Sequence, residues 1–177
     1  MSNSLEAACS LVGRFQYHFA RVEQKIDRAV IKLFDLDDKT GPIITANVDF
    51  AKKVNFVKTS AYQQAVNNKD RDFVEKTCND VFAINGVRQF VIHSSFEPHK
   101  DGVQFRRMVS KKGFVRVDQP VWNDSKFSEH YSTMKNLEGE LGKLIKLIKK
   151  PVPFDWYNAL AGPVTIPYTV RHKIQRK

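Results

Sequence analysis

Apolar residues recur at intervals of three and four along the first part of the chain. An α-helix has 3.6 residues per turn, so this spacing gathers them on one face and predicts a long helix over about residues 4–36. The turn residues of DLDDKTGP, with the breakers Gly41 and Pro42, end the pattern. The repeat consists of Val12, Phe15, Phe19, Val22, Ile26, Ala29 and Leu33.

Three weaker helical patterns follow. A second helix is expected at about residues 45–66, and a third begins at Asp70 or Asp72 and continues toward His93. A fourth is expected at about 125–149, capped by Asp124 or Ser125. It contains Gly139 and Gly142, each of which costs roughly 1 kcal/mol against alanine. Either close approach of another backbone or a simple kink explains them.

The period changes between the third and fourth helices. Residues 103–109 (VQFRRMV) and 114–118 (FVRVD) are short, rich in Val and Phe, and joined by SKKG, which predicts a basic β-hairpin. The ending PVPFDWYNALAGPVTIPYTV has no helical period and is interpreted as an extended arm. The expected fold is mainly α: an antiparallel bundle of about four helices in residues 1–150, a hairpin at about 103–118 before the last helix, and a basic arm at 151–177.

Bulk composition suits a globular protein. A chain of 177 residues with 42% hydrophobic and 27% charged content can bury a core in one domain. Cys9 and Cys78 follow no metal or redox spacing, so neither a disulfide framework nor a zinc site is expected. No apolar run reaches roughly 18 residues, and no basic segment precedes the first apolar residues. A soluble protein of the cytoplasm is therefore expected.

The net charge of +10 is concentrated in two clusters. RHKIQRK ends the chain, and RRMVSKKGFVR lies in the predicted hairpin with no acidic residue. Such clusters favour polyanionic partners through counterion release, and nucleic acid, anionic lipid or an acidic protein would fit. A solvated basic face is the alternative. The hairpin residues expected to bind RNA are Arg106, Arg107, Lys111, Lys112 and Arg116.

The third predicted helix carries an arginine on its apolar face. With Arg88 at zero degrees, Ile84 and Val91 lie at about −40 and −60 degrees. An unpaired buried guanidinium costs several kcal/mol, so either a carboxylate meets Arg88 or the face opens there to water. Asn85, Gln89 and His93 form a polar row beside it, at about 60, 100 and 140 degrees.

The stretch VRQFVIHSSF resembles the R-x4-6-H signature of HEPN domains, and FARVEQKI in the first helix is similar to a pattern common in helical proteins of this type. The resemblance loosely covers residues 11–149. In that family the motif sits near the end of a helix in an all-α bundle, and two protomers bring their motifs into one composite site. Many members are metal-independent ribonucleases of toxin or antiviral systems. The residue after the arginine is most often Asn there, whereas here it is Gln89.

The resemblance implies a metal-free endoribonuclease without a cofactor, acting as a homodimer in the cytoplasm and restrained by an antitoxin or defence-system partner. The 2′-hydroxyl of RNA would attack the adjacent phosphorus in line and leave a 2′,3′-cyclic phosphate. His93 would serve as general base or acid, and Arg88 would neutralise the phosphoryl charge. Gln89 would orient the imidazole or bind phosphate. The supporting residues are Asn85 and Ser94, with Glu23 expected to pair with Arg88 and His18 as a weaker candidate for the same pocket.

Other interpretations remain open. The chain is alternatively an inactive HEPN-like dimeric module that binds nucleic acid or a protein partner, with Arg88 as a scaffold arginine and His93 as a helix cap. HSSFEPH offers His93, Glu97 and His99 to a metal, although the spacing matches no strong ligand pattern. GKLIKLIKK suits a membrane surface but is explained more simply as a core stripe with lysines at a helix C-terminus.

Overall fold

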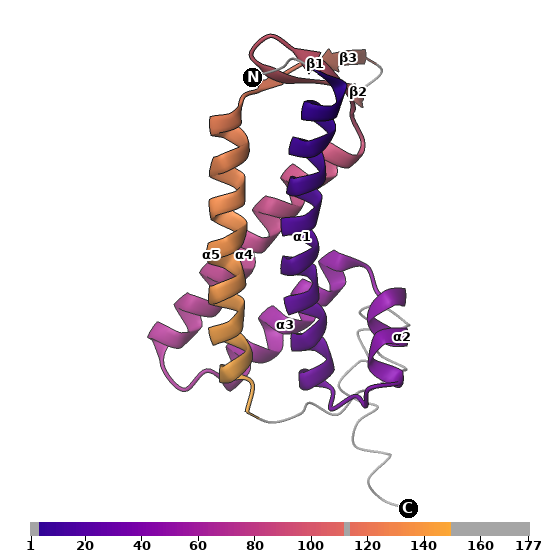
Figure 1. The fold of residues 1–177 in the computed structure, drawn as a ribbon. Helices are drawn as coiled ribbons and strands as arrows, with labels where there is room; N and C mark the ends of the chain where they lie inside the picture. Colours follow the sequence, from indigo (N-terminus) through magenta and orange to yellow (C-terminus); the bar gives the residue numbers. More distant parts are fainter. Residues whose placement is uncertain (1–3, 112–113, 150–177) are drawn as a thin grey trace, which may run out of the picture.

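A computed structural model describes residues 4–111 and 114–149 of the chain; within these ranges the fold is mainly helical, with a small antiparallel sheet before the last helix (Figure 1). The arm expected at 151–177 lies outside the described residues. The elements are α1 (Leu5–Leu33), α2 (Thr40–Asn47), α3 (Phe50–Gln64), α4 (Asn68–Ile92), β1 (Ser95–His99), β2 (Gly102–Lys111), β3 (Phe114–Asp118), β4 (Val121–Trp122) and α5 (Asp124–Leu147).

The helix boundaries differ from expectation in three places. The second predicted helix is two helices, because Val48 adopts an extended backbone between α2 and α3. The third begins earlier, since the Asn67 side chain, rather than an aspartate, accepts the Asp70 N–H at 2.9 Å. Asn123 caps α5 in the same way through the Lys126 N–H. Asparagine is among the best N-cap residues, but the residues that follow each asparagine were expected to cap these helices instead.

Helix directions only partly follow the expected antiparallel bundle. Helices consecutive in the chain alternate in direction, but α1 and α5 lie side by side and run parallel (Figure 1). The Tyr131 hydroxyl bonds the Leu11 carbonyl near their starts, and Lys32 bonds the Ile145 carbonyl near their ends. The β-sheet follows α4, so the chain enters α5 from the end of the body at which α1 also begins.

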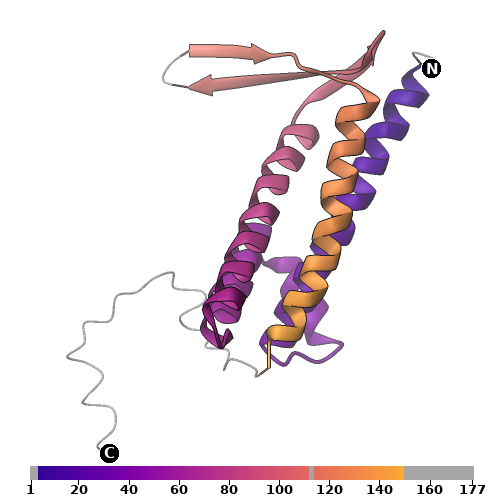
Figure 2. The ribbon, with the colours of Figure 1, turned by 90° about the vertical axis from the view of Figure 1, so that its left-hand side faces the viewer.

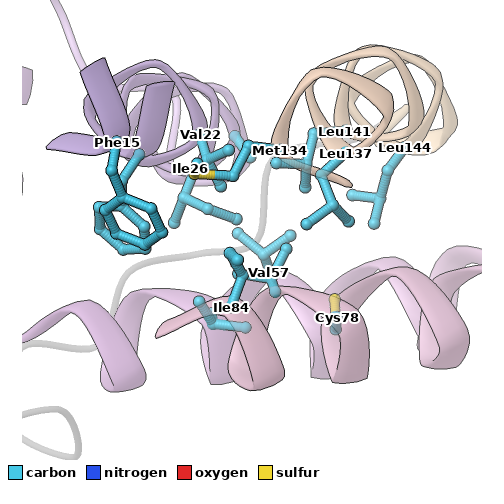
Figure 3. Packing of buried hydrophobic residues seen from close by; sticks show 14 of the residues in the cluster. Phe15, Val22, Ile26, Val57, Cys78, Ile84, Met134, Leu137, Leu141 and Leu144 are labelled. Carbon is cyan, nitrogen blue, oxygen red and sulfur yellow. The ribbon is translucent and has the colours of Figure 1, made fainter. Parts of the chain in front are cut away.

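The core lies where α1 and α5 meet α3 and α4 (Figure 3). The predicted stripe of α1 is buried from Phe15 to Leu33, and Val12 is half-buried at its edge. The α5 stripe packs beside it, and the α3 and α4 residues close the opposite side. Each buried Leu, Ile or Phe contributes roughly 1.5–3 kcal/mol, so this cluster holds the body together. Its labelled members are Phe15, Val22, Ile26, Val57, Cys78, Ile84, Met134, Leu137, Leu141 and Leu144.

The hairpin is confirmed and is longer than expected. β2 pairs with β1 over Gly102–Arg106 and with β3 over Arg107–Lys111. β1 was not predicted, because SFEPH contains a proline and follows directly on a helix. Gly102 is required at the turn: its φ is +140°, and a Cβ there would collide with the Trp122 carbonyl oxygen. The distal half, formed by β2 and β3, projects past the end of α4 (Figure 2).

Two interpretations of the last helix are resolved. A Cβ built on Gly139 or Gly142 meets no atom within 4 Å, so close approach of another backbone is not the reason for either glycine. In GKLIKLIKK, Leu144 and Ile148 are buried in the core, as the core-stripe interpretation requires. In the described part of the chain, no helix is both long and apolar enough to cross a bilayer.

Candidate functional site

Arg88 lies on α4 against the first helix. Its guanidinium carbon is 5.2 Å from the centre of the Phe19 ring, a cation–π contact. The side chain is half-buried, and its Nε is buried without a hydrogen-bond partner. Among the described residues no carboxylate pairs with it. The guanidinium thus lacks the anion that such a group usually finds when it is partly buried.

The expected pairing of Glu23 with Arg88 is wrong. Glu23 and Asp27 lie one turn apart on α1, and Lys53 of α3 reaches both, with Nζ–O distances of 3.3 and 2.6 Å. Lys53 is only 3% exposed, so it needs these carboxylates more than an arginine beside an aromatic ring does. Burial raises the pKa of Asp27, and the hydrogen bond from Lys53 opposes that rise.

His93 forms the C-cap of α4 and is exposed. Its Nε2 lies 2.9 Å from the Gln89 amide oxygen. With that oxygen as acceptor, Nε2 carries the hydrogen and Nδ1 is left to accept a proton. The Ser94 hydroxyl donates to the Phe90 carbonyl at 2.7 Å and so closes the last turn. Gln89, one turn before His93, therefore contacts the imidazole as the first of its two expected roles requires, and its binding of phosphate stays a prediction.

Arg88 and His93 face different surroundings within one protomer. The arginine packs inward on Phe19, whereas the imidazole is held by Gln89 in solvent. The Oδ1 atom of Asn85 is buried without a hydrogen-bond partner. His18 does not support Arg88, because its ring packs on Tyr17 and Tyr131 at 5.4 and 5.2 Å instead.

The projecting hairpin has two different faces. On the side that packs on the body, Val103 and Phe105 are buried. Because side chains alternate along a strand, this side continues into what we call the inner face. The opposite side is the outer face, where Met108 lies across from Val117 and Ser110 from Val115. The inner face consists of Arg107, Val109, Phe114, Arg116 and Asp118, and the outer face of Arg106, Met108, Ser110, Val115 and Val117.

The basic residues expected to bind RNA are divided between these faces. Arg107 and Arg116 share the inner face with Phe114, which is 79% exposed. The Arg116 guanidinium bonds the Asp118 carboxylate two residues along the same strand. Arg106 lies on the outer face and is exposed. Lys111 is the last residue of β2, and Lys112 lies outside the described residues.

An aromatic cluster that the sequence analysis missed attaches the sheet to the helices. Phe105 of β2 and Trp122 of β4 have ring centres 4.9 Å apart, and Phe90 and Phe127 pack on them from α4 and α5. His130 completes the cluster: it is 8% exposed and lies 4.9 Å from the Trp122 ring. Burial lowers the pKa of His130, and Lys126 adds to the effect. The sequence could have indicated that His130 is buried, because it lies on the apolar stripe of α5, one residue before Tyr131.

Metal binding receives no support from the described residues, which contain no group of three His, Cys, Asp or Glu able to hold an ion. His99 instead accepts the Asp101 N–H at Nδ1, at 3.2 Å.

A pocket lies between the starts of α1 and α5, at the end of the body that carries the sheet. It is lined by Ser4, Leu11, Lys100, Asp101 and Asn123, among others. None of the predicted site residues lines it.

In comparisons with known proteins, no family model matches the sequence, and no match was found among curated proteins or solved structures. The functional assignment therefore depends on the geometry alone.

Proposed function

We propose that the protein binds single-stranded RNA at the end of the body where the hairpin projects. The observation that carries this proposal is the inner face, on which an exposed phenylalanine, Phe114, is followed along the hairpin by Arg116 and then by Arg107. Guanidinium groups bind phosphates, and an exposed aromatic ring stacks on an unpaired base. Duplex RNA would offer the phosphates but hide the bases, so the aromatic ring favours single strands.

The end of α4 is the second part of the proposed site. It leads directly into β1, so Arg88 and His93 lie at the same end of the body as the sheet (Figure 1). Arg88 lacks an anion among the described residues, and a phosphate oxygen would supply one. His93 is exposed and offers a further polar contact.

Binding of a fluorescently labelled single-stranded RNA of about 12 nucleotides, followed by anisotropy over a salt series, tests this proposal. Single-strand binding weakens with a slope of about 0.7 per phosphate contact in a plot of log affinity against log salt. Arg107→Ala and Arg116→Ala should each lower the slope by about that amount. Phe114→Ala should weaken binding roughly tenfold with little change of slope.

Arg28→Ala is the matched control, because Arg28 is an exposed arginine on α1 away from the sheet. It should leave both affinity and slope nearly unchanged. Equal losses in Arg28→Ala and Arg107→Ala would show a diffuse charge effect and would contradict a hairpin site.

Cleavage of the bound RNA is a second candidate function, favoured by the orientation of His93. With Nε2–H donated to the Gln89 amide oxygen, Nδ1 can accept a proton, as a general base requires. Arg88 faces other surroundings, so cleavage requires either that it leave Phe19 or that a second protomer supply one of the two groups.

Incubation of the purified protein with RNA in EDTA tests this candidate. Cleavage with a 2′,3′-cyclic phosphate product, lost in His93→Ala and Arg88→Lys but retained in His99→Ala, would support it. Arg88→Lys keeps the positive charge but removes the paired N–H donors of the guanidinium. Binding without any cut by the wild type would leave RNA binding as the function.

A further inference from the structure

The distal half of β2 has an open edge. β1 accompanies β2 only as far as Arg106, where it pairs with Ser95. From Arg107 to Lys111 the strand has β3 on one side, and none of the described strands on the other. Backbone N–H and C=O groups along such an edge can pair with an added strand.

The outer face beside this edge is apolar and exposed. Met108 is 74% exposed, Val115 69% and Val117 41%. A two-stranded ribbon is marginally stable in water by itself, and a third strand would supply hydrogen bonds and cover these side chains. A strand added at this edge would therefore both pair with the open backbone groups and cover the exposed apolar side chains.

We propose that this edge binds an extended segment of an acidic partner protein in which aliphatic and acidic residues alternate. A strand added beside Arg107–Lys111 places every second side chain on the outer face, next to Met108, where an aliphatic residue fits. The side chains between them fall on the inner face, next to Arg107, where an acidic residue fits. The chain's net charge of +10 would attract such a segment from solution.

A second copy of this chain fits the edge poorly. Two β2 edges paired about Val109 would set Arg107 of each copy opposite Lys111 of the other. Two β3 edges paired about Arg116 would set that arginine opposite itself. Like charges directly opposite each other destabilise a strand pair, so these two registers disfavour self-association.

RNA also fits this edge less well than a peptide. It can engage the guanidinium groups of the inner face, but it has no strand backbone to pair with β2. Met108 and the two valines of the outer face would remain in water when RNA binds. The combination of open edge and apolar outer face is therefore explained by a polypeptide and not by the proposed RNA function.

Anisotropy with labelled nonapeptides tests the inference on the full chain. The probes are an alternating Glu-Val peptide, a peptide of the same composition with the glutamates grouped at one end, and an alternating Lys-Val peptide. The alternating acidic peptide should bind at least tenfold more tightly than either of the others. Arg107→Glu and the double variant Met108→Ser/Val117→Ser should each weaken it about tenfold, and Arg28→Glu should not.

The outcomes separate this inference from RNA binding. Equal affinity for the alternating and grouped peptides, or no binding at millimolar concentration, would overturn the strand site. A concentration-dependent dimer that Met108→Ser/Val117→Ser abolishes would overturn it in favour of a second copy. The same double variant should leave RNA affinity unchanged, because its side chains lie on the outer face. Circular dichroism of each variant confirms that the body remains folded.

Discussion

The helical body and the projecting hairpin are built in opposite ways. In the body, α1, α4 and α5 bury continuous apolar stripes against one another. In the hairpin, none of the described side chains from Arg106 to Asp118 is buried. The hairpin therefore depends on its backbone ladder and on the anchor at Phe105 and Trp122. Because these side chains do not pack into the core, charged and exposed apolar groups can gather on the hairpin.

The substitution with the largest expected effect on stability replaces one leucine of the body. Leu141 is fully buried on α5, so Leu141→Ala removes apolar burial and leaves a cavity. We expect a loss of about 2–5 kcal/mol in the free energy of unfolding, measured by urea denaturation. Val115→Ala in the hairpin should change it by about 0.5 kcal/mol or less. A comparable loss for Val115→Ala would show that the hairpin belongs to the folded core.

A second test concerns the buried charge of the body. Lys53→Ala leaves Glu23 and Asp27 without their shared partner in partly buried positions. We expect a loss of about 2 kcal/mol, below the value for a fully buried pair because both carboxylates are about one-third exposed. Lys52→Ala is the matched control on the same helix, since Lys52 is exposed, and it should cost about 0.5 kcal/mol at most. Equal effects would contradict a structural role for Lys53.

A third test addresses the boundary between the two regions, where His130 lies in the aromatic anchor. Its pKa in the folded protein is lowered, so the unfolded chain binds the proton more readily. The stability contributed by the neutral imidazole is complete above about pH 6.5, the ordinary value, and declines as the pH falls through the lowered pKa. His130→Phe should flatten this decline below about pH 6.5. A parallel decline in both proteins would show that His130 is not the group responsible.

The sequence predicted the body better than the site, for a physical reason. Spacing alone determines which face of α1 is buried, and the stripe from Phe15 to Leu33 is confirmed. Glu23 was expected to pair with Arg88, but its actual partner, Lys53, comes from α3. Which helix packs beside Glu23 is decided by the tertiary fold, and no local sequence pattern indicated it. Likewise, α1 and α5 run parallel because the sheet after α4 brings the chain back to the end of the body where α1 begins. The hairpin was predicted from its residues, but its projection and its two faces needed the register of β2 and β3.

A single buried thiol reports on the two regions separately, and the smallest effect expected of any variant is that of Val115→Ala on this thiol. In a Cys9→Ser background Cys78 is the remaining cysteine of the chain, it is fully buried, and burial raises the pKa of its thiol to about 11. It reacts with a disulfide reagent only when the body opens, so its labelling rate follows the population of open forms. Val115→Ala should leave that rate unchanged. Leu141→Ala should raise it about thirtyfold or more, because each 1.4 kcal/mol of lost stability multiplies the open population by about ten. Faster labelling of Cys78 in Val115→Ala would mean that the hairpin and the body open together, and the independence of the two regions would fail.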